Sequence, residues 1–454
     1  MSARAVLLIT VLGVALAPIQ VQAANKQSYL TLDAAVSAAH SNDIWQTGNK
    51  HSQEAIQAAS VAAGTLPDPA ISIAFANLPV DTFDFDQEGM TQFKVGVSQM
   101  FPKGDSLAIK KKQLTLKGQQ FPYQRQDRQA KTTVIISQLW LNAFKAQQSI
   151  ALIEKDRALF EQLIDVAQAR YSTALGKTRQ YDIVRAQLEM TRLENRLTML
   201  RQQYDRYRYQ LNEWFSEDMQ STQASRGITE LNQSIMTLPL ASKLPAIPLL
   251  NETLRHPESK PDPQKILEAM ALHPALKALN KKIDASTLGI DLANQKYKPA
   301  WGVNGSYAYR DNDEMGNERA DFFSIGVSFD LPVFTAQRQD QQVKEAISLS
   351  EAIKTEKHLL LRKMLASYET ARIQLLRLNQ RQALYHSTLL PQIDEQAEAA
   401  LTAYTNDEGD FAEVVRARIA QLDAGIDSLS INVDRQILIA QLNYFFADNN
   451  EKSN

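Results

Sequence analysis

The ten residues Phe93–Pro102 (FKVGVSQMFP) return as Phe323–Pro332 (FSIGVSFDLP), 230 positions later in a chain of 454 residues. The same offset takes Pro69 and Ala70 to Pro299 and Ala300. Each copied unit covers about 200 residues, which is much longer than the repeat of a solenoid protein. The pattern therefore predicts two pseudo-symmetric halves that arose by duplication.

The halves are separated by a change in composition. We expect the first unit at 24–215 and the second at 264–447, with a polar tail at 448–454. The intervening stretch, 216–263, is rich in Ser, Thr, Asn and Pro, which disfavour long helices and strands. It is interpreted as a linker or equatorial region between the halves.

Four segments alternate large apolar residues with small or polar ones, at about 69–77, 91–101, 299–309 and 321–331. A period of two indicates β-strands with one apolar face, and 9–11 residues is the length that a tilted strand needs to cross a bilayer. Apolar groups outside and small polar groups inside are typical of a transmembrane barrel. We expect the lumen to be lined by Ser72, Ser98, Asn304 and Ser328. We expect lipid to contact Ile73, Val95, Val303 and Ile325. The alternative is a soluble sheet with one buried face.

Four strands are too few to close a barrel around an open bore, because even small closed barrels use about eight. Three copies of the chain would supply about twelve strands, an even number within the observed range. The pattern therefore predicts a homotrimer that shares one barrel, embedded in outer-membrane lipid.

Long helical stretches follow each pair of strands, at about 104–172 and 178–215 and again at about 335–404 and 409–446. Pro122 is predicted to kink the first of them. Apolar residues spaced alternately by four and three positions indicate a coiled-coil seam; they are Leu193, Leu197, Leu200, Tyr204, Tyr207, Leu211 and Trp214. The predicted fold class is thus an α+β membrane protein, mostly helical, whose barrel continues into a helical tunnel.

The first residues are typical of a secretory signal peptide. Arg4 precedes an apolar run, and small residues at Val21 and Ala23 predict cleavage of residues 1–23. A short N-terminal anchor helix is the alternative. Cysteine is absent, so an exported chain would carry no lipid on an N-terminal cysteine.

Composition also argues against several classes of function. The 49 Lys and Arg residues nearly balance the 51 Asp and Glu residues, which does not favour a nucleic-acid partner. The six histidines show no metal-ligand spacing, and no phosphate loop or nucleophile elbow is present. We therefore expect no catalytic residues, no cofactor and no metal site. A soluble periplasmic coiled-coil scaffold is the main alternative to a membrane duct.

The chain resembles the TolC family of outer-membrane factors over nearly its whole mature length. The resemblance rests on the signal peptide, the duplicated unit, and the strands that flank long coiled-coil helices. The stretches 66–69 (LPDP), 77–81 (NLPVD), 90–91 (MT) and 99–102 (QMFP) are similar to its heavy-metal efflux branch. The resemblance implies an exit duct in the cell outer membrane that extends into the periplasm. A periplasmic adaptor protein and a proton-driven inner-membrane pump would feed it with heavy-metal cations such as copper or silver. Drug efflux and type I protein secretion are the alternative cargoes.

The resemblance also places two helix-hairpin turns at the periplasmic entrance. Adaptor contacts are expected at Gly176, Lys177, Thr178 and Arg179 in the first turn, and at Gly409 in the second. Family members narrow the entrance with acidic residues, and the candidates here are Asp407, Glu408, Asp410 and Glu413. Arg416 stands where the family often has a second acid, so this chain departs from the two-ring acidic pattern. The alternative for the acidic residues is an ordinary solvated turn.

Overall fold

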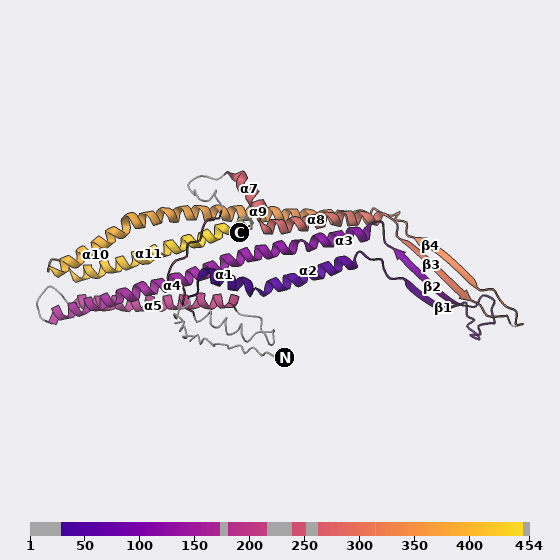
Figure 1. Ribbon diagram of the computed structural model, residues 1–454, viewed down its shortest axis with the longest axis horizontal. Helices are drawn as coiled ribbons and strands as arrows, with labels where there is room; N and C mark the ends of the chain where they lie inside the picture. The colour runs from indigo at the N-terminus through magenta and orange to yellow at the C-terminus, as the bar shows by residue number, and fades with distance from the viewer. Residues whose placement is uncertain (1–28, 173–179, 216–237, 251–261, 314, 448–454) are drawn as a thin grey trace, which may run out of the picture.

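A computed structural model describes residues 29–172, 180–215, 238–250, 262–313 and 315–447. The molecule is long, with a β-sheet at one end and two helical hairpins at the other (Figure 1). The predicted signal peptide, the first hairpin turn, most of the linker and the polar tail lie outside the described residues. In the part that the structure describes, no helix combines the length and apolar composition needed to cross a bilayer.

The order of elements repeats, as the duplication predicts. The first copy comprises α1 (Leu32–Ser41), α2 (Ile44–Ala62), β1 (Ala70–Ala76), β2 (Gln92–Phe101), α3 (Ser106–Gly118), α4 (Gln120–Ser172) and α5 (Gln180–Phe215). The second comprises α7 (Pro263–Ala271), α8 (Pro274–Asn294), the 3₁₀ turn η2 (Gln295–Tyr297), β3 (Trp301–Tyr309), β4 (Phe322–Phe329), α9 (Gln339–Leu384), the π-helical turn η3 (Tyr385–Leu389), α10 (Leu390–Thr405) and α11 (Phe411–Tyr444). The chain is mostly helical, as expected.

The four strands form one antiparallel sheet in the order β1-β2-β3-β4. The central pair, β2 and β3, joins the two copies, with Val95 opposite Tyr307 and Phe101 opposite Trp301. Helices continue from the strands in the same order, because α2 packs on α3, α3 on α8 and α8 on α9. Four strands and four helices therefore form a wall one layer thick (Figure 1).

Two helices predicted as continuous are interrupted near prolines. The helix expected at about 104–172 divides at Gly118, four residues before Pro122, where the proline ring would meet the carbonyl group of a continuous helix. The helix expected at about 335–404 divides at η3, just before Pro391 at the start of α10. The π-helical turn adds a residue to the local turn and makes room for the ring. Pro122 thus marks a break, as predicted, whereas the break near Pro391 was not predicted.

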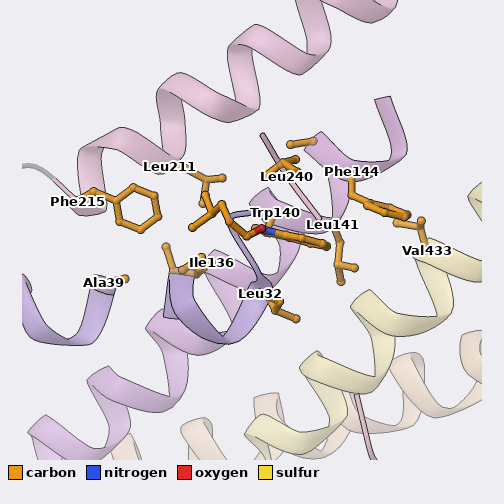
Figure 2. Packing of buried hydrophobic residues seen from close by; sticks show 13 residues of the cluster. Leu32, Ala39, Ile136, Trp140, Leu141, Phe144, Leu211, Phe215, Leu240 and Val433 are labelled. Atoms are coloured by element: carbon orange, nitrogen blue, oxygen red, sulfur yellow. The ribbon is translucent and has the colours of Figure 1, made fainter. Parts of the chain in front are cut away.

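The core lies in three clusters of buried side chains spaced along the molecule. The first is centred on Trp140 and Phe144 of α4, whose rings stack with centroids 5.5 Å apart (Figure 2). The indole nitrogen of Trp140 donates a hydrogen bond to the carbonyl oxygen of Leu30 at 3.0 Å. Leu240, from the segment between the copies, joins this cluster and pairs with Leu30 through a parallel bridge. The middle of the molecule is therefore held by residues from both ends of the first copy and from the linker.

The predicted seam on α5 is at a helix interface. Leu193 and Leu197 are buried in a cluster that also contains residues of α4, α10 and α11, and Leu200 packs against it. Tyr204 packs on the cluster around Trp140. The heptad spacing therefore identified the face of α5 that turns inward.

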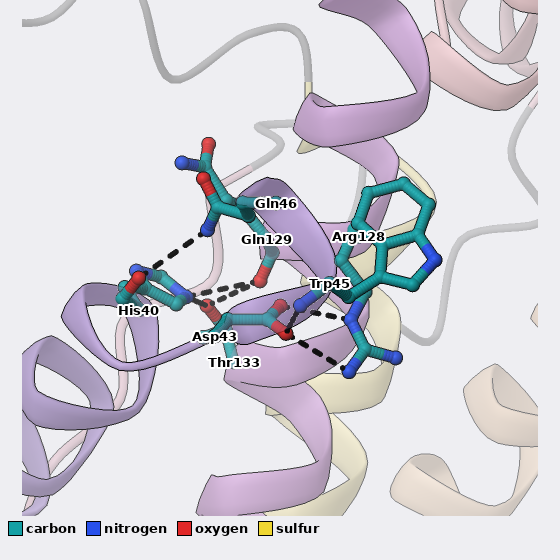
Figure 3. Close-up of polar contacts among 7 residues, drawn as sticks. All are labelled: His40, Asp43, Trp45, Gln46, Arg128, Gln129 and Thr133. Atoms are coloured by element: carbon teal, nitrogen blue, oxygen red, sulfur yellow. Dashed lines mark hydrogen bonds and ion pairs between the residues drawn. The ribbon is translucent and has the colours of Figure 1, made fainter. Parts of the chain in front are cut away.

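The corner between α1 and α2 is fixed by a charged group (Figure 3). Asp43 caps α2 by accepting a hydrogen bond from the amide of Trp45, and its carboxylate also accepts two bonds from Arg128 of α4, at 2.8 and 3.2 Å. The guanidinium lies over the rings of Trp45 and Trp214, 5.7 and 5.1 Å from their centroids. This contact joins the start of α2 to α4 and to the end of α5.

Candidate functional site

The register of the sheet decides which side chains share a face. In an antiparallel sheet, directly opposed residues point to the same side. Ser98 lies opposite Asn304, Gly96 opposite both Ser72 and Ser306, and Gly302 opposite Ser328. The four residues expected to line the lumen, Ser72, Ser98, Asn304 and Ser328, therefore share one face.

Small residues dominate this face, and the sheet curls towards it. Ser306 and Ala308 are only 6% and 3% exposed, although they belong to a sheet that is one layer thick. An added Cβ at Gly96 would lie 2.8 Å from the hydroxyl oxygen of Ser72, and one at Gly302 would lie 2.6 Å from that of Ser328. The glycines thus leave room for polar side chains of the neighbouring strands on the concave side.

The opposite, convex face is apolar, and no other part of the described structure covers it. Ile73 and Ile325 are 68% and 74% exposed, and Val95 and Val303 are also exposed. Aromatic side chains gather at its two ends. At the loop end, Phe75 packs on Phe93 and Phe85 stacks on Tyr309; at the helix end, Trp301 packs on Phe329. An apolar band between two aromatic rows is the arrangement that transmembrane strands present to lipid.

The loops at the far end of the sheet are tied together by arginines. Arg310 donates a hydrogen bond to the carbonyl oxygen of Gly89 at 2.6 Å, and its guanidinium lies 4.6 Å from the ring centroid of Phe322. Arg319 donates to the carbonyl oxygens of Asp86 and Glu88. The acidic loop between β1 and β2 is therefore held against the loop between β3 and β4, which the sequence did not indicate.

At the other end of the molecule, α10 and α11 are joined by a tight turn. The amide of Glu408 donates to the carbonyl oxygen of Ala403 at 2.9 Å, and the amide of Asp407 donates to that of Tyr404 at 3.2 Å. These two bonds form a Schellman motif, with Asp407 in the left-handed region at φ 59°. An added Cβ at Gly409 would meet the backbone of Tyr404 at 2.8 Å, so this position requires glycine.

The acidic candidates take different positions around this turn. Asp410 caps α11 through a bond from the amide of Ala412 at 3.1 Å, and Glu413 lies exposed in the first turn. Arg416 is exposed one turn later and donates to the carbonyl oxygen of Ala412 in its own helix. Among the ion pairs of the described residues, none joins Arg416 to Glu413. Gly176, Lys177, Thr178 and Arg179 lie outside the described residues.

A polar layer that the sequence did not indicate lies between α5, α10 and α11. Arg418 of α11 pairs with Glu398 of α10 at 2.9 Å, and Gln421 donates to Asp394 of α10 at 2.8 Å. Arg196 of α5 pairs with Asp423 of α11. The first two contacts join neighbouring helices of one hairpin, whereas Arg196 and Asp423 are 227 positions apart, and neither kind follows from the spacing within a single helix.

A partly buried carboxyl group lies near the same layer. Burial raises the pKa of Asp156 on α4 above its ordinary value, and the positive charges of Lys155 and Arg418 oppose this only in part. Ionisation of Asp156 therefore costs more free energy in the folded protein than in the unfolded chain.

The fold is shared with solved membrane channels. The outer-membrane channel OprN superposes with a TM-score of 0.71 at 14% identity, over 92% of this chain and 89% of that one. The outer membrane protein VceC from Vibrio cholerae gives 0.71 at 10%, over 91% and 96%. The Campylobacter jejuni CmeC outer membrane channel gives 0.70 at 12%, over 92% and 86%. No family model and no curated protein matches the chain. The chain therefore has the fold of outer-membrane channels, and the near-equal scores favour no branch among them.

Proposed function

We propose that this protein is the outer-membrane exit duct of a tripartite efflux system, built from three copies of the chain. The observation that carries the proposal is the single-layer wall: four strands and four helices in matching order, with a small polar concave face and an apolar convex face. Such a wall cannot enclose a core by itself, and closing it with further copies creates a bore.

Both edges of the wall are suited to contact with further copies. At one edge β1 has an unpaired side and α2 exposes Trp45 and Val61; at the other, β4 has an unpaired side and α9 exposes Leu349 and Leu359. Open strand edges seek pairing, and exposed apolar side chains on long helices favour burial against a neighbour. Twelve strands spaced by about 4.8 Å and tilted by about 40° would enclose a barrel roughly 24 Å across.

The periplasmic entrance in this proposal is the α10–α11 turn. Three copies of Asp410 and exposed Glu413 would bring acidic groups together around the axis, and such rings attract cations. The outer side of this turn, with Gly409, and the turn at 176–179 would receive the periplasmic adaptor, which joins the duct to a proton-driven inner-membrane pump.

The entrance can be tested without disturbing the helix cap. In planar bilayers, Asp410→Asn with Glu413→Gln should weaken block by a trivalent cation such as hexamminecobalt, because asparagine still accepts the bond from the amide of Ala412. Asp407→Asn with Glu408→Gln tests the other two acidic candidates, and a loss of block in that variant alone would place the acidic ring on the turn itself. Equal block in the double variant and the wild type would remove Asp410 and Glu413 from the entrance.

The proposed cargo is a heavy-metal cation such as copper or silver, supported by the motifs at 66–69, 77–81 and 99–102. Expression in a bacterium that lacks its own duct, together with a metal pump and adaptor, should restore copper or silver tolerance. Restored tolerance to drugs with a drug pump, and none to metals, would reassign the cargo.

The duct itself is tested by reconstitution of the purified full chain. We expect lasting, stepwise ion conductance in planar bilayers and trimers that dissociate only on heating in detergent. A monomeric protein that never conducts would overturn the proposal and favour a soluble periplasmic scaffold.

A further inference from the structure

The four strands carry a single charged side chain, Lys94, among the residues Ala70–Ala76, Gln92–Phe101, Trp301–Tyr309 and Phe322–Phe329. Lys94 lies directly opposite Ala74 on one side and Ala308 on the other. These register pairs place it on the concave face with Ser72, Ser98, Asn304 and Ser328. The charge therefore points away from the apolar face.

The level of Lys94 along the sheet is also defined. It follows Phe93, which lies opposite Phe75 and Tyr309 in the aromatic row at the loop end. Lys94 is thus near the loop end of the sheet, at the third residue of β2, which begins at Gln92. Within the described residues, Lys94 forms no ion pair and no hydrogen bond, so no carboxylate there neutralises its ammonium group.

We propose that Lys94 determines ion selectivity at the exit of the duct, where three copies form a ring of positive charge that favours anions over cations. The proposal rests on the trimeric duct described above. Lys94 is half-buried beside the small residues Ala74 and Ala308, and the sheet register places its ammonium group on the concave face that lines the proposed bore. A bore of roughly 24 Å brings three such charges within about one screening length of a passing ion at 0.1 M salt.

The ring gives the bore just inside the acidic β1–β2 loop a charge opposite to that of the entrance. The acidic groups near Asp410 and Glu413 would attract cations at the entrance, whereas Lys94 would repel free cations at the exit. Cargo driven by the pump would leave most readily as an anion, a neutral molecule or a complexed metal. The return of free external cations would be opposed at the mouth.

The expected effect follows from Coulomb's law. Three unit charges at about 8 Å in water, screened at 0.1 M salt, raise the local anion concentration about threefold and lower that of cations about threefold. The permeability ratio of chloride to potassium should therefore fall by up to about tenfold in Lys94→Gln and by more in Lys94→Glu. Lys94→Arg should keep the wild-type ratio. In 1 M salt, where the screening length is only about 3 Å, all four proteins should converge.

A second experiment restores the charge without relying on the folding of a charged variant. The chain has no cysteine, so Lys94→Cys is a unique thiol in the full-length protein. A positively charged methanethiosulfonate reagent should return the ratio to the wild-type value, and a negatively charged reagent should lower it further. Val95→Cys, the next residue on the lipid face, should not react with either reagent.

The outcomes separate this inference from the proposed function. Wild-type protein that forms no pores would overturn the duct and the ring together. Pores whose selectivity is unchanged in Lys94→Gln and in modified Lys94→Cys would overturn the ring alone. Reaction of Val95→Cys but not Lys94→Cys would show that the faces of the sheet are assigned the wrong way round.

Discussion

Asp43 and His273 stand 230 positions apart, and each caps the helix that leads to the first strand of its copy. Asp43 accepts from the amide of Trp45 at 3.3 Å, and the His273 ring nitrogen accepts from the amide of Ala275 at 3.2 Å. Each cap also contacts a distant helix, Asp43 through Arg128 and His273 through the carbonyl oxygen of Tyr444. Both copies therefore have a helix cap with a long-range contact at the same position, but the cap is a carboxylate in the first copy and an imidazole in the second.

Removal of the charged cap should destabilise the middle of the molecule. Asp43→Ala should lower the free energy of unfolding by about 2 kcal/mol or more, because it removes the cap of α2 and leaves Arg128 without its carboxylate between two tryptophans. Asp43→Asn should cost about 1 kcal/mol, because asparagine still caps the helix. Thermal unfolding of the detergent-purified protein measures both. Both variants lose the ion pair with Arg128, so equal losses would show that the cap of α2 contributes nothing.

Arginine substitutions should distinguish the two faces of the sheet. Ile73→Arg places a charge on the apolar face and should cost about 2–4 kcal/mol near the middle of the bilayer. Ser72→Arg, one residue earlier, faces the small polar side and should assemble almost normally. The yield of heat-modifiable protein in outer-membrane fractions reports the difference. Equal assembly defects in both variants would contradict the proposed orientation of the strands.

These faces show what sequence pattern could predict. Strict alternation in the strands identified both faces, and the copy of Phe93–Pro102 at Phe323–Pro332 identified the duplicated order of elements. The pairing of β2 with β3 and the links from Arg310 and Arg196 depend on contacts between distant segments, which one sequence does not encode locally. The break before Pro391 needed a π-helical turn, which has no simple sequence signal.

Charges in the buried seam of α5 should prevent assembly. Leu197 is 2% exposed and Leu200 packs beside it, so aspartates at both positions would be desolvated without partners. We expect the double variant to yield no stable trimer on native gels. The matched control, Thr198→Asp with Gln202→Asp, places the same charges on the exposed side of α5. Normal trimers from the Leu197 and Leu200 variant would contradict the helix packing.

The carboxyl group of Asp156 should make stability depend on pH. Burial raises its pKa in the folded protein above the unfolded value, so the folded state holds this proton more tightly. The stabilisation is complete below the unfolded pKa and is lost as the pH rises through the folded pKa. Asp156→Asn should therefore raise the melting temperature at pH 7 relative to the wild type and leave it unchanged near pH 3.

The control for Asp156 is Asp165, an exposed aspartate on the same helix. Asp165→Asn should leave the melting temperature unchanged at both pH values. A gain at pH 7 that appears equally in both variants would point to the overall charge of the protein rather than to the burial of Asp156.

The central claim, that copies of this chain close one barrel, is tested most directly by cross-linking β1 to β4. The two strands lie at opposite edges of the sheet, about 14 Å apart, which is too far for a disulfide within one chain. Single cysteines placed in both strands, stepping along Ser72 and Ala74 against Ser324 and Ser328, should give covalent trimers under oxidising conditions for at least one pair. The control pair Ser98→Cys with Asn304→Cys, which are directly opposed, should give a disulfide within the monomer. The account predicts trimers on denaturing gels that reduction returns to monomers, and monomers alone from every β1–β4 pair would contradict it.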